Sequence, residues 1–237
     1  MVRRLGSLGE VGGDSVARSG SNVVYRDRIE AGRRLASHLE EYRGLQPLIL
    51  GIPRGGVPVA AAVAEALGAD LDIVVARKLV APSQPELAIG AVTANGGRYL
   101  NERIIHELGV SEAYLEAEIA RKLAEAHERE AHMRGDCAKL PVKGRTVIVV
   151  DDGLATGATI RAAVRSVRRA NPARLVAAVP VGAPESCAEL TAEVEHLVCP
   201  EQPPMFFAVG QFYEHFEPTT EDEVRRLLAS ARGSVRA

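Results

Sequence analysis

The stretch that decides the fold of this 237-residue chain is TVIVVDDGLATGAT, at residues 146–159. Residues 147–150 are four β-branched residues without polar alternation, a pattern typical of a strand buried on both faces of a parallel sheet. Two carboxylates, Asp151 and Asp152, follow at once, and a small-residue turn then leads into a helical pattern. The order strand, turn, helix predicts an α/β fold, with both carboxylates at the carboxyl end of a central strand, where such sheets bind ligands.

The turn after these carboxylates has the composition of an anion site. A helix start leaves backbone N–H groups unpaired and carries partial positive charge, small residues let an anion come close, and threonine hydroxyls can donate to it. Two neighbouring carboxylates accept hydrogen bonds from a diol or hold hydrated Mg²⁺. A ribose 5-phosphate satisfies both ends, and an ordinary turn after a buried strand is the alternative. The predicted phosphate contacts are Gly153, Ala155, Thr156, Gly157, Ala158 and Thr159.

A second strand–turn–helix unit precedes this one, at residues 47–67. PLILG at 47–51 predicts a buried strand, and the turn after it contains Pro53, Arg54, Gly55 and Gly56. A cation beside exposed N–H groups forms a second anion site, unless the arginine is simply solvated. A third strand is expected at 71–76. It ends at Arg77 and Lys78, which would face the same crevice or form a solvated basic turn.

Residues 79–98 contain two prolines and three glycines, and we expect a mobile loop that leads into a hairpin. Their only carboxylate, Glu86, is a candidate general acid or base, or a solvent-facing side chain. Helices are expected at 26–42, 57–67, 101–108, 111–134, 184–190 and 221–228, and further strands at 174–181 and 194–198.

Aromatic residues make up only 4% of the chain, yet they concentrate in residues 199–216. Phe206, Phe207 and Tyr213 could stack on a flat ring. The same rings could instead form a small satellite core beneath the last helix. The residues leave both interpretations open.

Composition excludes several classes of protein. A net charge of −2 argues against a general nucleic-acid binder, and no apolar run is long enough to span a membrane. Three cysteines without a C-x-x-C pair argue against a disulfide framework or a zinc site and fit a reducing cytoplasm. Residues 1–22, rich in Gly and Ser, predict a flexible tail, and 23–237 a single domain.

Taken together, four apolar residues, two acids, a small-residue loop and a T-G-x-T ending resemble the phosphoribosyl pyrophosphate (PRPP) motif of type I phosphoribosyltransferases. The resemblance covers residues 48–198. It implies a mostly parallel, Rossmann-like sheet flanked by helices, a mobile loop at 79–98 and a C-terminal hood, residues 199–217. It also implies a homodimer that uses Mg²⁺, PRPP and a small-molecule acceptor.

The resemblance also implies roles for the candidate residues. The 5-phosphate would bind residues 155–159, and the ribose hydroxyls and Mg²⁺ would bind Asp151 and Asp152. Pyrophosphate would lie on residues 53–56, with its charge balanced by Arg54 and by Arg77 or Lys78. The nucleobase would lie against Phe206, Phe207 and Tyr213 in the hood.

The implied reaction is transfer of the phosphoribosyl group to a nitrogen nucleophile, with a non-catalytic PRPP sensor or a ribose-phosphate hydrolase as alternatives. Ala155 stands where hypoxanthine- and guanine-using relatives carry a carboxylate, which disfavours 6-oxopurines. The motif looks most like that of the adenine-using branch, but residues 79–98 lack the loop signature of that branch. The acceptor is therefore left open.

Overall fold

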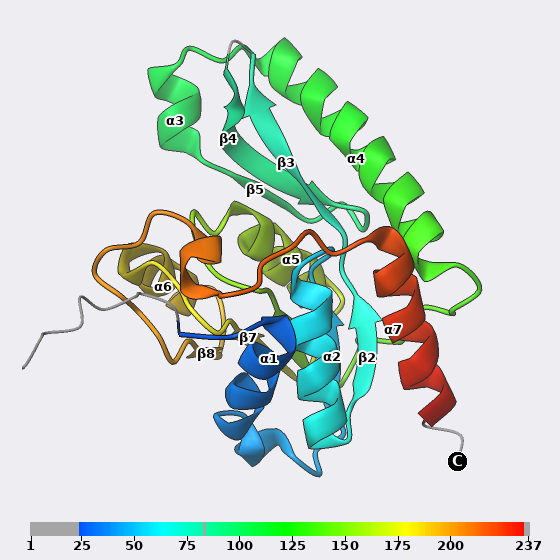
Figure 1. The fold of residues 1–237 in the computed structure, drawn as a ribbon. Helices are drawn as coiled ribbons and strands as arrows, with labels where there is room; N and C mark the ends of the chain where they lie inside the picture. Colours follow the sequence, from blue (N-terminus) through cyan, green and yellow to red (C-terminus); the bar gives the residue numbers. More distant parts are fainter. Residues whose placement is uncertain (1–23, 83, 235–237) are drawn as a thin grey trace, which may run out of the picture.

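The computed structural model describes residues 24–82 and 84–234, so the predicted tail at 1–22 lies outside the described residues. A five-stranded parallel sheet forms the centre, in the order β2-β1-β6-β7-β8 (Figure 1). Its strands are β1 (Leu48–Gly51), β2 (Asp70–Ile73), β6 (Thr146–Val150), β7 (Arg174–Ala178) and β8 (His196–Val198). The predicted α/β fold with a mostly parallel sheet is confirmed.

The strand order reverses between β1 and β6. From β1 the chain moves outward to β2, and from β6 it moves the other way, to β7 and β8. The connections therefore leave opposite faces at this point, and in open α/β sheets ligands bind beyond the carboxyl ends of the strands at such a point. Both predicted anion turns start there, because residues 52–56 follow β1 and residues 151–157 follow β6.

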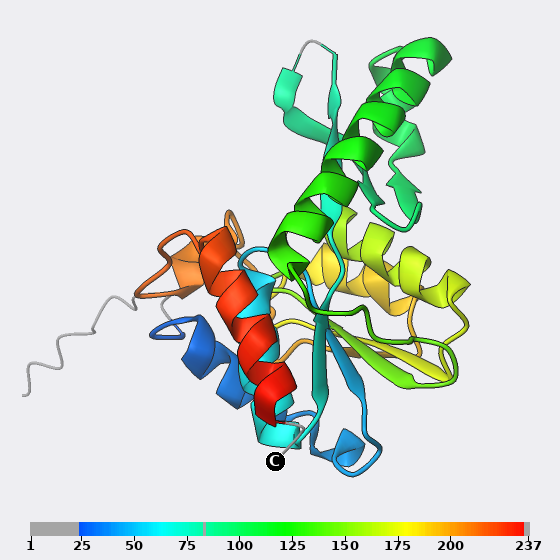
Figure 2. The same ribbon diagram turned by 90° about the vertical axis from the view of Figure 1, so that its right-hand side faces the viewer.

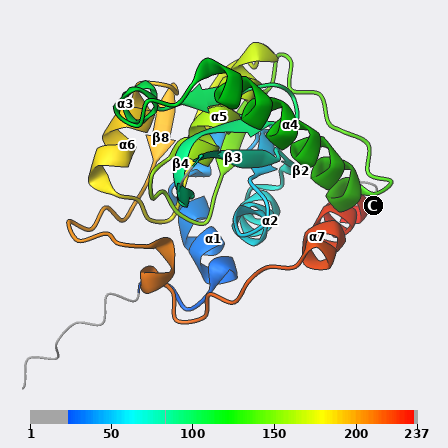
Figure 3. The ribbon, with the colours of Figure 1, turned by 90° about the horizontal axis from the view of Figure 1, so that it is seen from above.

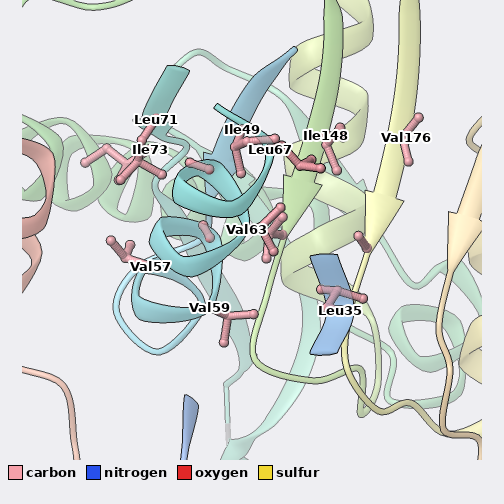
Figure 4. Packing of buried hydrophobic residues seen from close by; sticks show 14 of the residues in the cluster. Leu35, Ile49, Val57, Val59, Val63, Leu67, Leu71, Ile73, Ile148 and Val176 are labelled. Atoms are coloured by element: carbon pink, nitrogen blue, oxygen red, sulfur yellow. The ribbon is translucent and has the colours of Figure 1, made fainter. Parts of the chain in front are cut away.

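Helices cover both faces of this sheet (Figures 2 and 3). On one face α1 (Arg28–Ser37), α2 (Gly56–Leu67) and α7 (Glu221–Ser234) pack over Ile49, Ile148 and Val176, as Figure 4 shows in part. On the other face α5 (Ala158–Arg169) and α6 (Pro184–Thr191) pack over the alternate strand residues Leu48, Val147 and Leu175. This burial on both faces explains the uninterrupted apolar runs in the strands.

A second sheet rises above the first. It is antiparallel, in the order β3-β4-β5, and consists of β3 (Ala76–Ala81), β4 (Gln84–Thr93) and β5 (Arg98–Leu100). Helices α3 (Glu102–Glu107) and α4 (Glu112–Arg134) pack on it, and Leu115 and Ile119 contribute to its core. Asn101 and Ser111 cap these helices through their side chains.

Two expectations about this region were wrong in their secondary structure. The hairpin expected within residues 79–98 is present as β4 and β5, but most of the expected loop is strand, because Pro82 and Pro85 lie beside the turn between β3 and β4 and Gly96 and Gly97 lie in the β4–β5 turn. The strand expected at 71–76 is divided: β2 ends at Ile73, and Ala76 already belongs to the second sheet. The prolines and glycines of this segment correctly indicated turns, but the turns are shorter than the loop that we expected.

The β4–β5 turn lies directly on helix α5. A Cβ added to Gly97 would come within 2.6 Å of the Ser166 Cα and 2.7 Å of its N, so a side chain has no room there. Arg169 Nη1 also donates to the Gly96 carbonyl at 2.9 Å. The second sheet and α5 are thus in backbone contact.

The segments at the two ends of the described chain meet. The hood is irregular except for a 3₁₀ turn, η2 (Val209–Phe212), and it lies beside the start of α1, where Tyr25 bridges Tyr213. A second 3₁₀ turn, η1 (Glu40–Tyr42), ends the predicted 26–42 helix. Within residues 24–82 and 84–234, no helix is both long and apolar enough to cross a membrane.

Candidate functional site

The acid pair, Asp151 and Asp152, stands at the end of β6 and is packed against the turn after β1. A Cβ added to Gly56 would come within 2.8 Å of the Asp151 Cα and 2.9 Å of the Val150 carbonyl oxygen. A Cβ on Gly55 would come within 2.8 Å of the Asp152 carboxylate carbon. Glycines at these two positions therefore allow the anion turn, residues 53–56, to touch the acid pair. The structure brings the two predicted anion turns together.

Arg28 holds one member of the acid pair, and the sequence analysis missed it. Its Nε donates to Asp152 Oδ2 at 2.9 Å, and its Nη1 donates to the Glu217 carbonyl at 2.8 Å. Its guanidinium carbon lies 3.8 Å from the centre of the Phe216 ring. Asp27 caps α1 and so fixes Arg28 as the first helical residue. A cation at a helix start carries no motif, so no sequence signal could have placed it here.

The hood is also fixed to the acid pair. The Tyr213 hydroxyl donates to the Asp152 carbonyl at 2.6 Å, and burial raises the pKa of this tyrosine. A Cβ added to Gly153 would come within 2.5 Å of Val209 Cγ1. The hood therefore lies directly over the residues that follow β6.

The electrostatics of the acid pair favour the binding of a cation. Burial, and then the neighbouring charge of Asp152, raise the pKa of Asp151 well above its usual range. Burial also raises the pKa of Asp152, although the Arg28 guanidinium opposes this. The charge of Lys78 acts on Asp151 in the same opposing direction as Arg28.

This donor set fits Mg²⁺, which proteins often hold with one or two carboxylates plus substrate phosphates. Among the described residues there is no group of three or more His, Cys, Asp or Glu side chains that could hold a metal. Asp151 and Asp152 would therefore be the protein ligands, and the remaining ligands would come from substrate and water. Their clustered negative charge would favour a divalent cation.

The 153–159 loop is anchored on its inner side and open on its outer side. The Leu154 N–H donates to the Val181 carbonyl at 2.9 Å, the Ala183 N–H donates to the Leu154 carbonyl at 2.8 Å, and Ser186 Oγ donates to the Ala155 carbonyl. Gly157 adopts a left-handed φ of 74° and precedes the first residue of α5, Ala158.

The outer side of this loop keeps free donors. Ala155 and Thr156 are exposed, and Thr159 is half-buried. Neither threonine hydroxyl has a hydrogen-bond partner within the described part of the chain. These hydroxyls and the N–H groups of the first helical turn lie where the anion cradle is predicted, and anion binding there stays a prediction.

The predicted cations occupy different environments. Arg54 is exposed and, within the described ranges, has no ion pair, while Pro53 is half-buried in the same turn. Lys78 is exposed and acts electrostatically on Asp151. Arg77 instead donates to Glu125 of α4 at 3.0 Å. Of the three predicted cations, Arg54 and Lys78 are therefore available to a ligand without breaking an ion pair.

Glu86 is not brought to the acid pair. It is exposed near the start of β4, the end of the hairpin that points away from the five-stranded sheet in Figure 1. Its predicted role as an acid or base therefore has no geometric support here, and a solvent-facing side chain fits its exposure.

The aromatic residues divide between the two interpretations. Tyr213 and Phe212 are buried with Tyr25 in a satellite core, so Tyr213 has no free face for a base. This core lies at the start of α1 and not, as expected, beneath the last helix, because α7 packs in the main core. Phe206 is half-buried against Phe212, with ring centres 5.1 Å apart. Phe207 is 85% exposed and keeps both faces free.

Comparison with known proteins identifies the family. A family model described as the phosphoribosyl transferase domain matches residues 25–216. The chain belongs to this family. The match includes α1 with Arg28, both anion turns, the acid pair and nearly all of the hood.

Relatives of this phosphoribosyl transferase domain include two Mycobacterium tuberculosis proteins. One carries the name "Putative phosphoribosyl transferase Rv0571c" in strain H37Rv, and its counterpart in strain CDC 1551 matches equally. Each is 41% identical over 208 residues, which is 88% of this chain and 47% of the relative. The chain thus spans about half the length of these curated relatives.

Among solved structures, the protein TT1426 from Thermus thermophilus is 41% identical, with a TM-score of 0.75. The similarity covers 88% of this chain and 99% of that one. A purine phosphoribosyltransferase from Pyrococcus horikoshii is 15% identical with a TM-score of 0.48, covering 84% of this chain and 97% of that one.

Proposed function

We propose that the protein transfers the 5-phosphoribosyl group of PRPP to a nitrogen nucleophile and releases pyrophosphate in a Mg²⁺-dependent reaction. One observation carries the proposal: the two turns predicted to bind anions meet at a half-buried acid pair, at the point where the strand order reverses. Membership of the phosphoribosyl transferase domain family supports it.

In this proposal each part of PRPP has a matching part of the site. The 5-phosphate binds the open side of the 153–159 loop and the start of α5. The ribose hydroxyls donate to the acid pair, and the pyrophosphate lies on the anion turn beside Arg54. Mg²⁺, held by Asp151 and Asp152, would neutralise charge on the pyrophosphate.

The protein would contribute position and charge, and no covalent intermediate. As the bond between ribose C1 and pyrophosphate oxygen breaks, C1 gains oxocarbenium character and the nucleophile nitrogen forms the new bond. Negative charge then grows on the leaving pyrophosphate, where the exposed side chains of Arg54 and Lys78 can balance it. Phe207 offers an exposed ring on which an acceptor base can stack.

The experiment is pyrophosphate release from PRPP with Mg²⁺ across purines, pyrimidines and pyridine bases, beside PRPP binding by calorimetry. Base-dependent release supports the transferase and names the acceptor. Binding without release for any base supports a PRPP sensor instead. Release of ribose 5-phosphate without an acceptor supports a hydrolase, and absence of PRPP binding overturns the proposal.

A matched pair of variants sharpens this experiment. Asp151→Asn combined with Asp152→Asn keeps the side-chain shape, and we expect it to abolish Mg²⁺-dependent PRPP binding. Asp70→Asn changes a carboxylate at the amino end of β2, where it pairs with Arg145 at 2.8 Å, and should leave PRPP binding intact. Compartment and oligomeric state, expected to be cytoplasmic and dimeric, stay predictions.

A further inference from the structure

Arg28 borders both the acid pair and the anion turn. Its Nε lies 2.9 Å from Asp152 Oδ2 and would lie 3.1 Å from a Cβ built on Gly55. Its side chain is only 12% exposed. A largely buried cation is thus positioned between the place proposed for the ribose diol and the place proposed for pyrophosphate.

We infer that Arg28 exchanges partners: it pairs with Asp152 in the free protein and binds the pyrophosphate of PRPP in the complex. This inference rests on the proposed function and adds to it a residue outside both predicted anion turns. It makes Arg28 a ligand-binding residue as well as a structural one.

The guanidinium has the capacity for this exchange. Arginine carries five N–H donors in a planar fork that matches two phosphate oxygens. In the described structure Nε donates to Asp152 and Nη1 to Glu217, while Nη2 has no hydrogen-bond partner among the described residues. Nη2 is therefore already available to an incoming anion, and release of Nε from Asp152 would complete one edge of the fork.

The acid pair also favours the exchange. While Arg28 pairs with Asp152 Oδ2, it occupies one lone pair of that oxygen and offsets its charge, which weakens the attraction of Asp152 for a cation. A ligand that brings its own cation to the acid pair and its own anion to Arg28 gives both groups a new partner. Breaking a buried ion pair is costly when it leaves one charge without a partner. Here both Arg28 and Asp152 would gain a new partner from the ligand.

The hood provides a fixed support for the guanidinium. The Phe216 ring and the Glu217 carbonyl both belong to the hood and both contact Arg28. These contacts hold the plane of the fork while the edge near Asp152 changes partner. The hood thus presents Arg28 to the ligand through two contacts that do not involve Asp152.

The test compares three ligands by calorimetry with Mg²⁺ present: PRPP, pyrophosphate and ribose 5-phosphate. For Arg28→Gln we expect the affinities for PRPP and pyrophosphate to fall at least about tenfold, as for loss of one charge-assisted hydrogen bond. The affinity for ribose 5-phosphate should hold or rise, because Asp152 is released to accept the ribose hydroxyls. Arg28→Lys keeps the charge but loses the planar fork. Its affinities for PRPP and pyrophosphate should lie between those of the wild type and those of Arg28→Gln.

Controls separate this inference from a purely structural role. Arg26→Gln alters an exposed neighbour whose Nε pairs with Asp27 at 3.0 Å, and it should bind all three ligands like the wild type. If Arg28→Gln weakens all three ligands alike, or none of them, the inference is overturned while the proposed function stands. If the wild-type protein binds no PRPP, the proposed function fails and this inference fails with it.

Discussion

Gly55 and Asp152 are in such close contact that the glycine cannot carry a side chain without moving the carboxylate. A Cβ at Gly55 would lie 2.8 Å from the Asp152 carboxylate carbon and 3.1 Å from Arg28 Nε. The backbone of Gly55 itself is ordinary, with φ of −63° and ψ of −34°. The glycine is therefore required by the neighbouring acid pair and not by its own conformation.

Gly55→Ala should consequently impair ligand binding more than folding. The added methyl group can be accommodated if the Asp152 side chain rotates away, which would break the Arg28 ion pair and disturb the proposed diol site. We expect PRPP affinity to fall at least about tenfold, with a loss of unfolding free energy near the lower end of ~1–3 kcal/mol. Calorimetry and urea unfolding measure the two effects.

The adjacent Gly56→Ala should show the opposite balance. Its Cβ would meet backbone atoms, at 2.8 Å from the Asp151 Cα and 2.9 Å from the Val150 carbonyl oxygen, and these cannot rotate away. We expect a loss of about 3 kcal/mol or more in urea unfolding. Equal stability losses for the two variants would contradict this distinction.

Asp151→Asn should stabilise the protein at neutral pH. Burial, and then the charge of Asp152, raise the pKa of Asp151 well above its usual range, so the folded state binds this proton more tightly than the unfolded chain. That stabilisation is complete below the unfolded pKa, about 3.9, and is lost as pH rises through the raised folded pKa. The asparagine variant does not lose it.

Urea unfolding of the metal-free protein at several pH values measures the effect. The gain over wild type should be about 1.4 kcal/mol at pH 7 for each unit by which the folded pKa is raised, and should shrink toward pH 4. The Asp152 N–H donates to Asp151 Oδ1 at 2.9 Å, and an asparagine oxygen can accept the same bond. A destabilised variant at pH 7 would show that the acid pair is not under electrostatic strain.

Tyr213→Phe tests the link between the hood and the acid pair. It removes the buried hydroxyl that donates to the Asp152 carbonyl at 2.6 Å, and we expect a loss of about 1 kcal/mol. Tyr25→Phe is the matched control, because it removes the hydroxyl of another buried tyrosine, which donates to the Pro180 carbonyl at 2.8 Å. Only the Tyr213 variant should also lower PRPP affinity.

Phe207→Ala and Phe212→Ala should separate a binding ring from a core ring. Phe207 is 85% exposed, so its removal should change stability by no more than about 0.5 kcal/mol while raising the KM for the acceptor base. Phe212 is buried, and its removal should cost ~3–5 kcal/mol. If acceptor KM is unchanged in Phe207→Ala, the base is held elsewhere.

The sequence predicted those parts of the site that local chain geometry creates. A β-branched run followed by acids, glycine and threonine specifies a buried strand, a tight turn and a helix start, and all three occur at residues 146–169. The same reasoning correctly placed residues 53–56 after β1. Because the carboxyl ends of parallel strands share one edge of the sheet, both turns could be expected to converge.

What the sequence could not predict depends on contacts between distant segments. Arg28 and Asp152 are 124 positions apart, and their ion pair exists only because α1 and the hood close over the same edge of the sheet. Tyr213 seemed suited to stacking, but its burial against Tyr25 follows from hood packing, which has no local pattern. Arg77 and Lys78 are adjacent in sequence, yet only Arg77 is within reach of Glu125 on α4.

The backbone contact between Gly97 and Ser166 has a mechanical consequence. It fixes the β4–β5 turn against the C-terminal half of α5, whose first residue borders the open side of the 153–159 loop. Any rotation of the second sheet would therefore also move α5 and the loop, so the sheet, the helix and the loop behave as one rigid unit. If the proposed function holds, a change of acceptor can then proceed by substitutions in the hood, without altering the loop proposed to bind the 5-phosphate.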